Sequence, residues 1–572
     1  MKRNETLAAL RERPDIAVLV IGGGINGISV FRELALQRVD VLLAEKGDYC
    51  GGASAALSRM VHGGLRYLEN GEFKLVKESL LERDRLLRNA PHYVAPLPTT
   101  VPIFDIFSGI ANGAVRFLGL TRRPSRRGAL VIKAGLTLYD VFTASRRLMP
   151  VHSFRGARKT LATWPAINPA TRSSATYYDA WVSRPERLGL EMLHDAMAAS
   201  PTAHALNYAQ VGSDADGLTL TDTISGETLP VRPRLIINAT GGWIDLTNRS
   251  IGVSAPTMMG GTKGSHIIVD SQELHDALAG QMIYYENEDG RICILFPYLG
   301  KVLIGSTDIR VDDPDQVRCE DDELAYILQS LAFVFPSIRI AEEEIVFRFS
   351  GVRPLPASED SFTGRIPRDH FCEFVEPIGA LPATLCMIGG KWTTFRSFGA
   401  LAADMALERL GLTREIGTEE LAIGGGRDFP ADTATWCAAL ASEYKISKAR
   451  AQTLLERYGS SARTVADEIS KTTDTMLPGY GYSHNEIRLI VEREQVETLA
   501  DIFLRRTTIA ITGGLTTELV DAVLDILATH KAWNAKQAAQ EHAAFVALLK
   551  HQHGVDLSNP SETDNKRSAI CA

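Results

Sequence analysis

Residues Ser58–Phe73, SRMVHGGLRYLENGEF, bring together side chains suited to proton transfer and to binding an anion. His62 has the type of side chain whose charge changes most readily near neutral pH. Arg66 is a permanent cation with a rigid fork of donors suited to phosphate or carboxylate. Gly63 and Gly64 lie between them, which indicates a sharp bend or a close approach to a ligand. Taken alone, the stretch is equally compatible with an ordinary glycine turn, so its meaning depends on the elements around it.

The elements that must position this chemistry begin at a glycine turn. Asp15–Ile21 is a short apolar run typical of a buried parallel strand, and it leads into Gly22-Gly23-Gly24-Ile25-Asn26-Gly27. A stretch with helical spacing follows, and a second strand over 39–45 ends in Glu45. This order predicts a dinucleotide site, with the pyrophosphate at the helix N-terminus and Glu45 on ribose hydroxyls. The acid disfavours a 2′-phosphate, which leaves FAD or NAD; glycine packing without a ligand is the alternative.

Two later strands also end in glycine turns. Leu235–Asn238 leads into Ala239-Thr240-Gly241-Gly242-Trp243, and Leu385–Ile388 leads into Gly389-Gly390-Lys391-Trp392-Thr393-Thr394. Neither glycine pair is informative alone. Their recurrence far apart suggests one nucleotide domain assembled from separated segments, and a large tethered flavin suits that arrangement better than an exchanging nicotinamide.

The composition is typical of a globular protein and gives no indication of nucleic-acid binding, disulfides or a metal site. A chain of 572 residues has room for about three or four domain-sized cores, and its 45% hydrophobic and 23% charged residues are typical of a globular protein. The net charge of −8 gives no general electrostatic reason to bind nucleic acid. The seven cysteines are scattered and never spaced as CxxC, so no disulfide framework, metal site or iron–sulfur site is predicted.

The protein is expected to be located in the cytoplasm. The first residues, MKRNETLAALRERPD, lack the apolar core of a secretory signal, and no run of about 18 apolar residues occurs that would span a bilayer.

The motifs together resemble a known family. IGGGING, VHGGLRYLE, NATGGW, KGSHIIV, GSTD, SGVRPL and GGKWTTFR occur in one order, and YGYSHNEIRLIVEREQ and LADIFLRRTTIA continue the likeness more faintly. In this set the chain resembles the FAD-dependent glycerol-3-phosphate dehydrogenases of the aerobic, respiratory type. The resemblance implies oxidation of sn-glycerol 3-phosphate to dihydroxyacetone phosphate by hydride transfer to the flavin, with electrons passed to ubiquinone or another quinone.

The resemblance also implies the fold. It is an α/β FAD-binding domain, Rossmann-like and of the D-amino-acid-oxidase/glutathione-reductase type, with an antiparallel β-sheet substrate cap and an all-α C-terminal domain. The expected segments are FAD-binding at 1–100, 236–260 and 351–415, cap and substrate sheet at 101–235 and 261–350, helical at 420–550, and a disordered tail at 555–572. The GGG at Gly424–Gly426 is expected to be a linker.

The resemblance assigns roles within the site. Arg66 and Arg353 lie in motifs that the family uses for the substrate phosphate and hydroxyls, and Lys391 could meet either the substrate or the reduced flavin. His62 and His266 are the two candidates for the base, and the choice between them stays open. The remaining expectations are substrate contacts from Tyr67 and Thr307, a turn cap from Asp308, and flavin contacts from Gly22, Gly23, Gly24, Asn26, Gly27, Glu45, Ser54, Ser58, Gly241, Gly389, Gly390, Lys391, Thr393 and Thr394.

The chain departs from the family pattern near the flavin. Ala55, Ala56 and Leu57 stand where a serine-rich run is usual, Arg59 replaces a lysine, and Ser306 replaces a threonine. The cation and histidine positions are intact. The departures therefore bear on which polyol phosphate is bound rather than on the reaction type.

Two segments near the cap have distinctive patterns. Glu72–Arg88 has the apolar stripe of an amphipathic helix, ended by Ala90-Pro91. Residues 101–147 combine an apolar, glycine-containing stretch with Arg122, Arg123 and neighbouring cations, a pattern typical of peripheral contact with the inner face of the cell membrane. A cap packed on the substrate domain is the alternative.

Other functions remain open at this point. The same chemistry could act on another polyol phosphate, such as a tetritol phosphate, or the enzyme could be an oxidase using O2. A tRNA-modifying or scaffolding flavoprotein is a further possibility, against which the acidic balance argues. A homodimer is possible.

Overall fold

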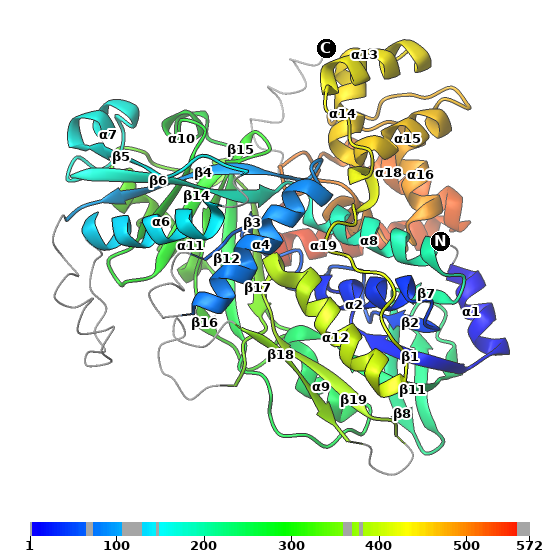
Figure 1. Ribbon diagram of the computed structural model, residues 1–572. Helices are drawn as coiled ribbons and strands as arrows, with labels where there is room; N and C mark the ends of the chain where they lie inside the picture. Colours follow the sequence, from blue (N-terminus) through cyan, green and yellow to red (C-terminus); the bar gives the residue numbers. More distant parts are fainter. Residues whose placement is uncertain are drawn as a thin grey trace.

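The nucleotide-binding part of the molecule is built around a mostly parallel sheet. The computed structural model describes residues 3–64, 72–105, 129–144, 148–357, 369–376 and 381–557. The sheet has the order β18-β19-β11-β1-β2-β7, and every neighbouring pair is parallel except β18 and β19 (Figure 1). Its strands are β1 (Asp15–Ile21), β2 (Val41–Ala44), β7 (Ala203–Leu206), β11 (Arg232–Asn238), β18 (His370–Val375) and β19 (Thr384–Gly389).

Helices and a small sheet cover the two faces of this sheet, which explains why its central strands are apolar without alternation. One face shares its core with α2 (Ile25–Leu36), α8 (Pro185–Ala199) and α12 (Phe395–Leu410). The other face packs against α1 (Arg3–Glu12), α9 (Ile244–Ser250) and the antiparallel strands β8 (Ala209–Asp214), β9 (Gly217–Asp222) and β10 (Thr228–Pro230).

A second, larger sheet carries the other half of the site. All its described pairings are antiparallel except that of β4 with β13. Its strands are β3 (Met60–Val61), β4 (Val94–Ile103), β5 (Ser153–Gly156), β6 (Ser173–Val182), β12 (Thr262–Val269), β13 (Met282–Glu286), β14 (Ile292–Tyr298), β15 (Lys301–Gly305), β16 (Ile309–Arg310) and β17 (Ile345–Arg353). The helices that pack on it are α4 (Phe73–Asn89), α6 (Ala129–Thr143), α7 (Ala157–Thr163), α10 (Gln272–Ala277) and α11 (Asp321–Val334).

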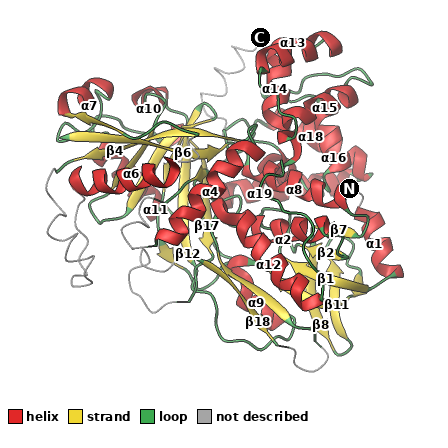
Figure 2. Cartoon of the chain, in the orientation of Figure 1, coloured by secondary structure: helices red, strands yellow, loops and turns green. Residues whose placement is uncertain are grey.

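The C-terminal part is helical and packs against the second sheet (Figure 2). Its helices are α13 (Thr433–Tyr444), α14 (Lys448–Tyr458), α15 (Ala462–Ile469), α16 (His484–Arg493), α17 (Leu499–Asp501), α18 (Thr517–Lys531) and α19 (Ala535–Leu548), with π-helical turns at Ile502–Arg506 and Leu549–His553. The short 3-10 turns of the described chain are Gly241–Trp243, Glu342–Glu344, Trp392–Thr394 and Gly424–Gly426, with Gly459–Ser461 between α14 and α15. Its apolar residues and those of the sheet form one core, so the two parts are joined by a continuous hydrophobic contact.

The boundaries differ from expectation in three places. β3 and most of β4 lie within the expected FAD-binding segment 1–100, but both strands belong to the second sheet, where they pair with β6. Residues 203–206 form β7, which pairs with β2, and α8 lies on the nucleotide-binding sheet, so part of 101–235 belongs to that sheet rather than to the cap. Gly424–Gly426 is a packed 3-10 turn instead of a linker. A Cβ at Gly425 would lie 1.9 Å from the Tyr458 carbonyl oxygen, so close backbone packing requires glycine there.

The expected membrane-contact segment lies mostly outside the described residues. Its described helix, α6, buries Leu136 and Tyr139 in a core shared with α4, which favours packing on the protein for this part. No helix in the described parts of the chain has the length and hydropathy required to span a bilayer.

Candidate active site

The first glycine turn is a tight junction between β1 and α2. Gly22 has φ of +108°, a conformation that L side chains rarely adopt. A Cβ on Gly27 would lie only 1.9 Å from the Gly22 carbonyl oxygen. The two glycines therefore let the chain reverse against the start of the helix, which leaves that helix end open to a ligand.

A cavity of about 720 Å³ begins at this turn. Gly22, Gly24, Asn26, Ser54 and Gly241 are among the predicted cofactor residues that line it. The buried Oδ1 of Asn26 has no hydrogen-bond partner within the described structure, which leaves it available to a bound group. Gly23 and Gly27 lie behind the lining and make the turn possible.

Glu45 reaches the same cavity from the end of β2. Its two carboxylate oxygens accept hydrogen bonds from the backbone N–H groups of Gly23 and Gly47, at 2.6 and 2.8 Å. Burial raises the pKa of the Glu45 carboxyl. The acid therefore ties the glycine turn to the end of β2 and still borders the space that a ribose would fill.

A second cavity of about 310 Å³ adjoins the first, because Ala53 and Pro354 line both. An elongated dinucleotide such as FAD fits two such connected spaces, one beside the helix N-terminus and one beside the reactive residues. The predicted residues that line the second cavity are Ser58, His62, His266, Thr307, Arg353, Gly390, Lys391 and Thr393. The structure thus brings together residues from widely separated motifs. Gly389 and Thr394 do not line either cavity.

Arg353 is held in place before any substrate binds. Its guanidinium donates to Asp308 Oδ1 at 2.9 Å and to the Thr307 carbonyl oxygen at 3.0 Å. Gly264 gives it room, because a Cβ there would lie 2.0 Å from Arg353 Nη2. Asp308, expected to cap the turn, forms an ion pair with this arginine. A fixed guanidinium is well suited to bind an anion with paired donors.

His266 lies in β12 and faces the second cavity. It is 3% exposed, its ring stacks on Phe349, and neither ring nitrogen has a hydrogen-bond partner among the described residues. Burial, with the nearby charges of Arg353 and Arg59, lowers the pKa of His266 to about 3. The imidazole is therefore neutral at physiological pH and has a nitrogen free to accept a proton.

Lys391 follows β19 of the nucleotide-binding sheet, and His62 directly follows β3 of the second sheet. The backbone N–H of His62 donates to Thr393 Oγ1 at 3.2 Å. This bond links the stretch Ser58–Phe73 to the glycine turn that follows β19. Lys391 Nζ donates to Ser79 Oγ at 3.3 Å, and the lysine lines the same cavity as His266.

Two residues that were predicted to contact a ligand form hydrogen bonds within the protein. The Thr307 hydroxyl donates to Glu323 at 2.7 Å and accepts from the Ser265 N–H at 2.9 Å, so the protein already engages it on both sides. The Ser54 hydroxyl accepts from the Ile25 N–H at 2.8 Å at the start of α2. Arg66 and Tyr67 lie outside the described residues.

Arg59, one of the departures from the family pattern, is a buried structural cation. It forms a two-pronged ion pair with Glu186 at the start of α8, with distances of 2.6 and 2.9 Å. This pair anchors the chain just before His62 to a helix of the nucleotide-binding part.

Sequence reasoning missed several lining residues. Asp179 on β6 accepts hydrogen bonds from Tyr139, from Arg83 and from the Gly63 N–H, the last two each at 3.1 Å. Burial raises the pKa of its carboxyl. Arg291 lines the cavity from the start of β14. Asp179 could have been predicted as a site residue, because it is a charged residue within the otherwise apolar strand YYDAWV. Nothing in the local sequence distinguished Arg291 from other arginines.

The chain is similar to characterised oxidoreductases over most of its length. Residues 17–396 match the family described as FAD dependent oxidoreductase, and residues 416–538 match the C-terminal domain of alpha-glycerophosphate oxidase. A glycerol-3-phosphate dehydrogenase of Synechocystis sp. is 31% identical, with 92% of this chain and 94% of the relative covered. A D-erythritol 1-phosphate dehydrogenase of Brucella abortus is 32% identical, with 86% and 93% covered.

The fold has a close counterpart among solved structures. The glycerol-3-phosphate dehydrogenase of Bacillus halodurans, complexed with FAD, aligns with a TM-score of 0.74 and 22% identity, covering 98% of this chain and 99% of the other. The similarity includes the helical C-terminal part as well as the two sheets.

Proposed function

Because the chain belongs to the glycerol-3-phosphate dehydrogenase family of FAD-dependent oxidoreductases, we propose that it oxidises sn-glycerol 3-phosphate to dihydroxyacetone phosphate and passes the electrons to a quinone. The observation that carries this function is the second cavity. It joins a fixed arginine, a neutral buried histidine and a lysine beside the space for the cofactor.

Substrate binding follows from charge. Arg353 binds the phosphate dianion, since Arg353 lines the second cavity and Asp308 and the Thr307 carbonyl hold its guanidinium in place. Bound phosphate offsets the positive charge of Arg353, one of the causes that lower the pKa of His266. The pKa of His266 therefore rises toward the range useful for proton transfer when substrate is present.

The reaction divides between the cofactor and the side chains. Bound FAD supplies the hydride acceptor for the hydrogen on the alcohol carbon. A ring nitrogen of His266 takes the hydroxyl proton as the C–O bond becomes a carbonyl. Lys391 supplies a positive charge that stabilises the negative charge developing in the site. His62 is the second candidate for the base, and it lines the same cavity.

The electron acceptor is proposed to be a quinone rather than O2. A quinone must be reached from the bilayer, and the apolar and basic residues of 101–147 support contact with the inner face of the cell membrane. Peroxide formed in stoichiometric amounts without added quinone would instead identify an oxidase.

D-erythritol 1-phosphate is a second candidate substrate. The Brucella abortus relative is named for it, and its identity to this chain is as high as that of the Synechocystis relative. A longer polyol phosphate presents the same phosphate to Arg353 and the same secondary alcohol to His266.

The deciding experiment is anaerobic reduction of the purified protein. We expect its flavin absorbance to bleach with sn-glycerol 3-phosphate, and to bleach faster than with D-erythritol 1-phosphate at equal concentration. Faster bleaching with the tetritol phosphate would reassign the substrate, and a flavin that neither compound reduces would refute polyol phosphate oxidation.

A further inference from the structure

The cofactor cavity has a wall that the nucleotide-binding part does not supply. Besides the glycine turns, the cavity of about 720 Å³ is lined from the C-terminal part by Thr498, Ala500, Arg505, Glu541, Ala544, Phe545 and Leu548. These residues come from α17 and its N-cap Thr498, from the π-helical turn Ile502–Arg506 and from α19. The family-derived division into a cofactor domain and a separate helical domain does not predict this wall.

The wall borders the space that the nucleoside end of the cofactor would fill. The pyrophosphate of FAD would be held at the start of α2, and the reactive residues His62, His266 and Arg353 line the other cavity. Glu45, at the end of β2, borders the cavity that the C-terminal residues complete. What remains on that side of the pyrophosphate is the ribose and adenine.

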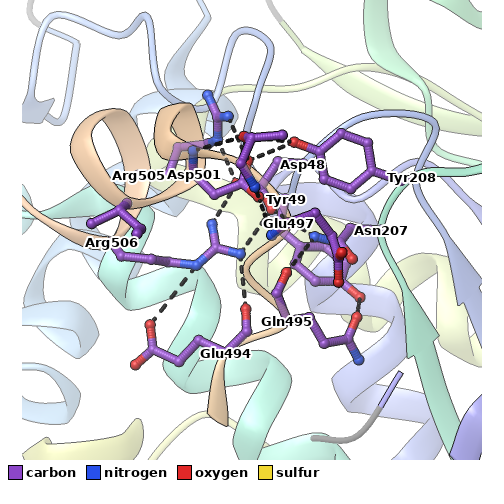
Figure 3. A network of polar contacts seen from close by, with 12 residues as sticks. Asp48, Tyr49, Asn207, Tyr208, Glu494, Gln495, Glu497, Asp501, Arg505 and Arg506 are labelled. Atoms are coloured by element: carbon purple, nitrogen blue, oxygen red, sulfur yellow. Dashed lines mark hydrogen bonds and ion pairs between the residues drawn. The ribbon is translucent and has the colours of Figure 1, made fainter. Parts of the chain in front are cut away.

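A buried ion pair cluster holds the loop after β2 against this wall (Figure 3). Asp48 accepts hydrogen bonds from Arg505 and from both terminal nitrogens of Arg506, one of them at 2.8 Å. Asp48 and Arg506 have fully buried side chains, and that of Arg505 is 14% exposed. Burial opposes ionisation of Asp48, yet the charges of Arg506 and Arg505 hold its pKa at about 2.

Hydrogen bonds extend the same junction on both sides of Asp48. Tyr49 donates to the Gln495 side chain at 2.9 Å, and Asn207 bridges Asp48 and the Gln495 carbonyl oxygen at 2.9 Å each. Tyr208, which lines the cavity, donates to Asp501 at 2.6 Å. All of these bonds except that between Asn207 and Asp48 join the segment Glu494–Arg506 to residues beside the ends of β2 and β7.

Such an arrangement restricts geometry more than it adds stability. Burying charges has a large desolvation penalty, so a buried pair contributes little net stability, but each partner strongly constrains the position of the other. The loop so constrained carries Glu45, Lys46, Gly47 and Asp48, all of which line the cofactor cavity.

We propose that Glu494–Arg506 is a cofactor-retention clamp: it fixes the loop after β2 and, with α19, closes the adenosine end of the FAD cavity. Release of FAD then requires this junction to open. The inference rests on FAD as the cofactor and is independent of which polyol phosphate is oxidised.

The chain contains a matched control for this junction. Arg450 pairs with Glu486 in the C-terminal part, with side chains 10% and 0% exposed, and Glu486 has a second arginine, Arg457. Arg505 pairs with Asp48 with 14% and 0% exposure, and Asp48 has Arg506. Arg450 does not line the cavity. Arg505→Met and Arg450→Met therefore remove equivalent cations, one at the cavity and one away from it.

The test follows FAD leaving the holoenzyme by the rise in flavin fluorescence, with no substrate present. We expect Arg505→Met to release FAD about tenfold faster than the unmodified protein, as loss of a charged hydrogen bond predicts. Arg450→Met should stay within about twofold of it, because Arg450 does not line the cavity and distant sites affect one another little. Equal release from both variants, or unchanged release from Arg505→Met, would overturn the clamp.

A second pair of variants leaves the ion pairs intact, should the arginine variants fail to fold. Ala544 and Ala543 are both exposed on α19, but only Ala544 lines the cavity. Ala544→Phe should weaken FAD binding by apoprotein, measured by fluorescence quenching, because its ring enters the adenosine space. Ala543→Phe should not. Unaltered FAD binding in Ala544→Phe would show that this wall does not face the cofactor.

Discussion

At the scale of single residues, Arg353 carries the affinity for the substrate phosphate. A hydrogen bond to a charged group contributes about 1.5–3 kcal/mol, and the guanidinium offers two such bonds at once. Arg353→Ala should therefore raise KM by at least about a hundredfold while bound flavin stays at one per chain. Steady-state kinetics and the flavin absorbance of the purified variant measure the two quantities.

Arg353→Lys separates charge from geometry. Lysine keeps the cation but lacks the planar fork, so its KM should lie between those of the unmodified protein and Arg353→Ala. Loss of flavin with unaltered substrate affinity would mean that Arg353 serves the cofactor instead.

The role of His266 can be tested by removing its ring nitrogens. His266→Asn should lower kcat/KM by about 10²–10⁴-fold, the usual contribution of a positioned base, with flavin retained. His62→Asn is the comparison, because both histidines line the cavity. A larger loss in His62→Asn would assign the proton to His62.

The low pKa of His266 also makes a prediction about stability. The ordinary value is 6.5 and the folded value is about 3, so unfolding takes up a proton below pH 6.5. The neutral ring therefore contributes stability that is fully present above pH 6.5 and is lost as pH falls toward 3. From pH 7 to pH 5 the unfolding free energy should fall by about 2 kcal/mol more in the unmodified protein than in His266→Asn. Urea unfolding at the two pH values measures this, and equal losses would contradict a buried neutral histidine.

At the scale of elements, the junction of β1 and α2 depends on a close backbone approach. A Cβ at Gly27 would lie 1.9 Å from Gly22 oxygen, so Gly27→Ala must displace α2 and with it the anion-binding helix end. We expect the purified variant to lose most of its FAD and to unfold at a lower temperature. Gly156→Ala is the control, since nothing lies within 4 Å of its Cβ position. Loss of FAD from both variants would show that FAD binding does not depend specifically on the close approach at Gly27.

At the scale of the whole molecule, the parts are expected to unfold together. The C-terminal helices share one core with the second sheet, and they also complete the cofactor cavity of the first. A ligand that binds only the folded state stabilises whatever unfolds with its site. Calorimetry should show one main transition that moves upward by several degrees when FAD is added to apoprotein. A second transition whose temperature does not change when FAD is added would show that the C-terminal part unfolds independently.

Local patterns predicted the elements that depend on local geometry. Asp15–Ile21 is β1 with the expected bounds, and Glu72–Arg88 became α4 with a shift of one residue at each end, because hydrophobic periodicity and chain-terminating residues act within one element. The resemblance supplied the fold class, the cofactor and the enzyme family, which the comparisons confirm. The membership of β7 in the first sheet was missed, because strand pairing is decided by non-local contacts.

By itself, the sequence predicted a dinucleotide site at a glycine turn and showed histidines and cations in motifs of its own; the phosphorylated alcohol was implied only by the family resemblance. The glycine turn and the motifs could be identified because turns, helix ends and side-chain chemistry are properties of a few consecutive residues. Only the tertiary structure decided that His266 on β12 and Arg353 on β17 line one cavity, that Glu323 engages the Thr307 hydroxyl, and that Arg505 and Arg506 reach Asp48. Those outcomes depend on packing between residues distant in the chain, where burial alters both the partner and the pKa of each group.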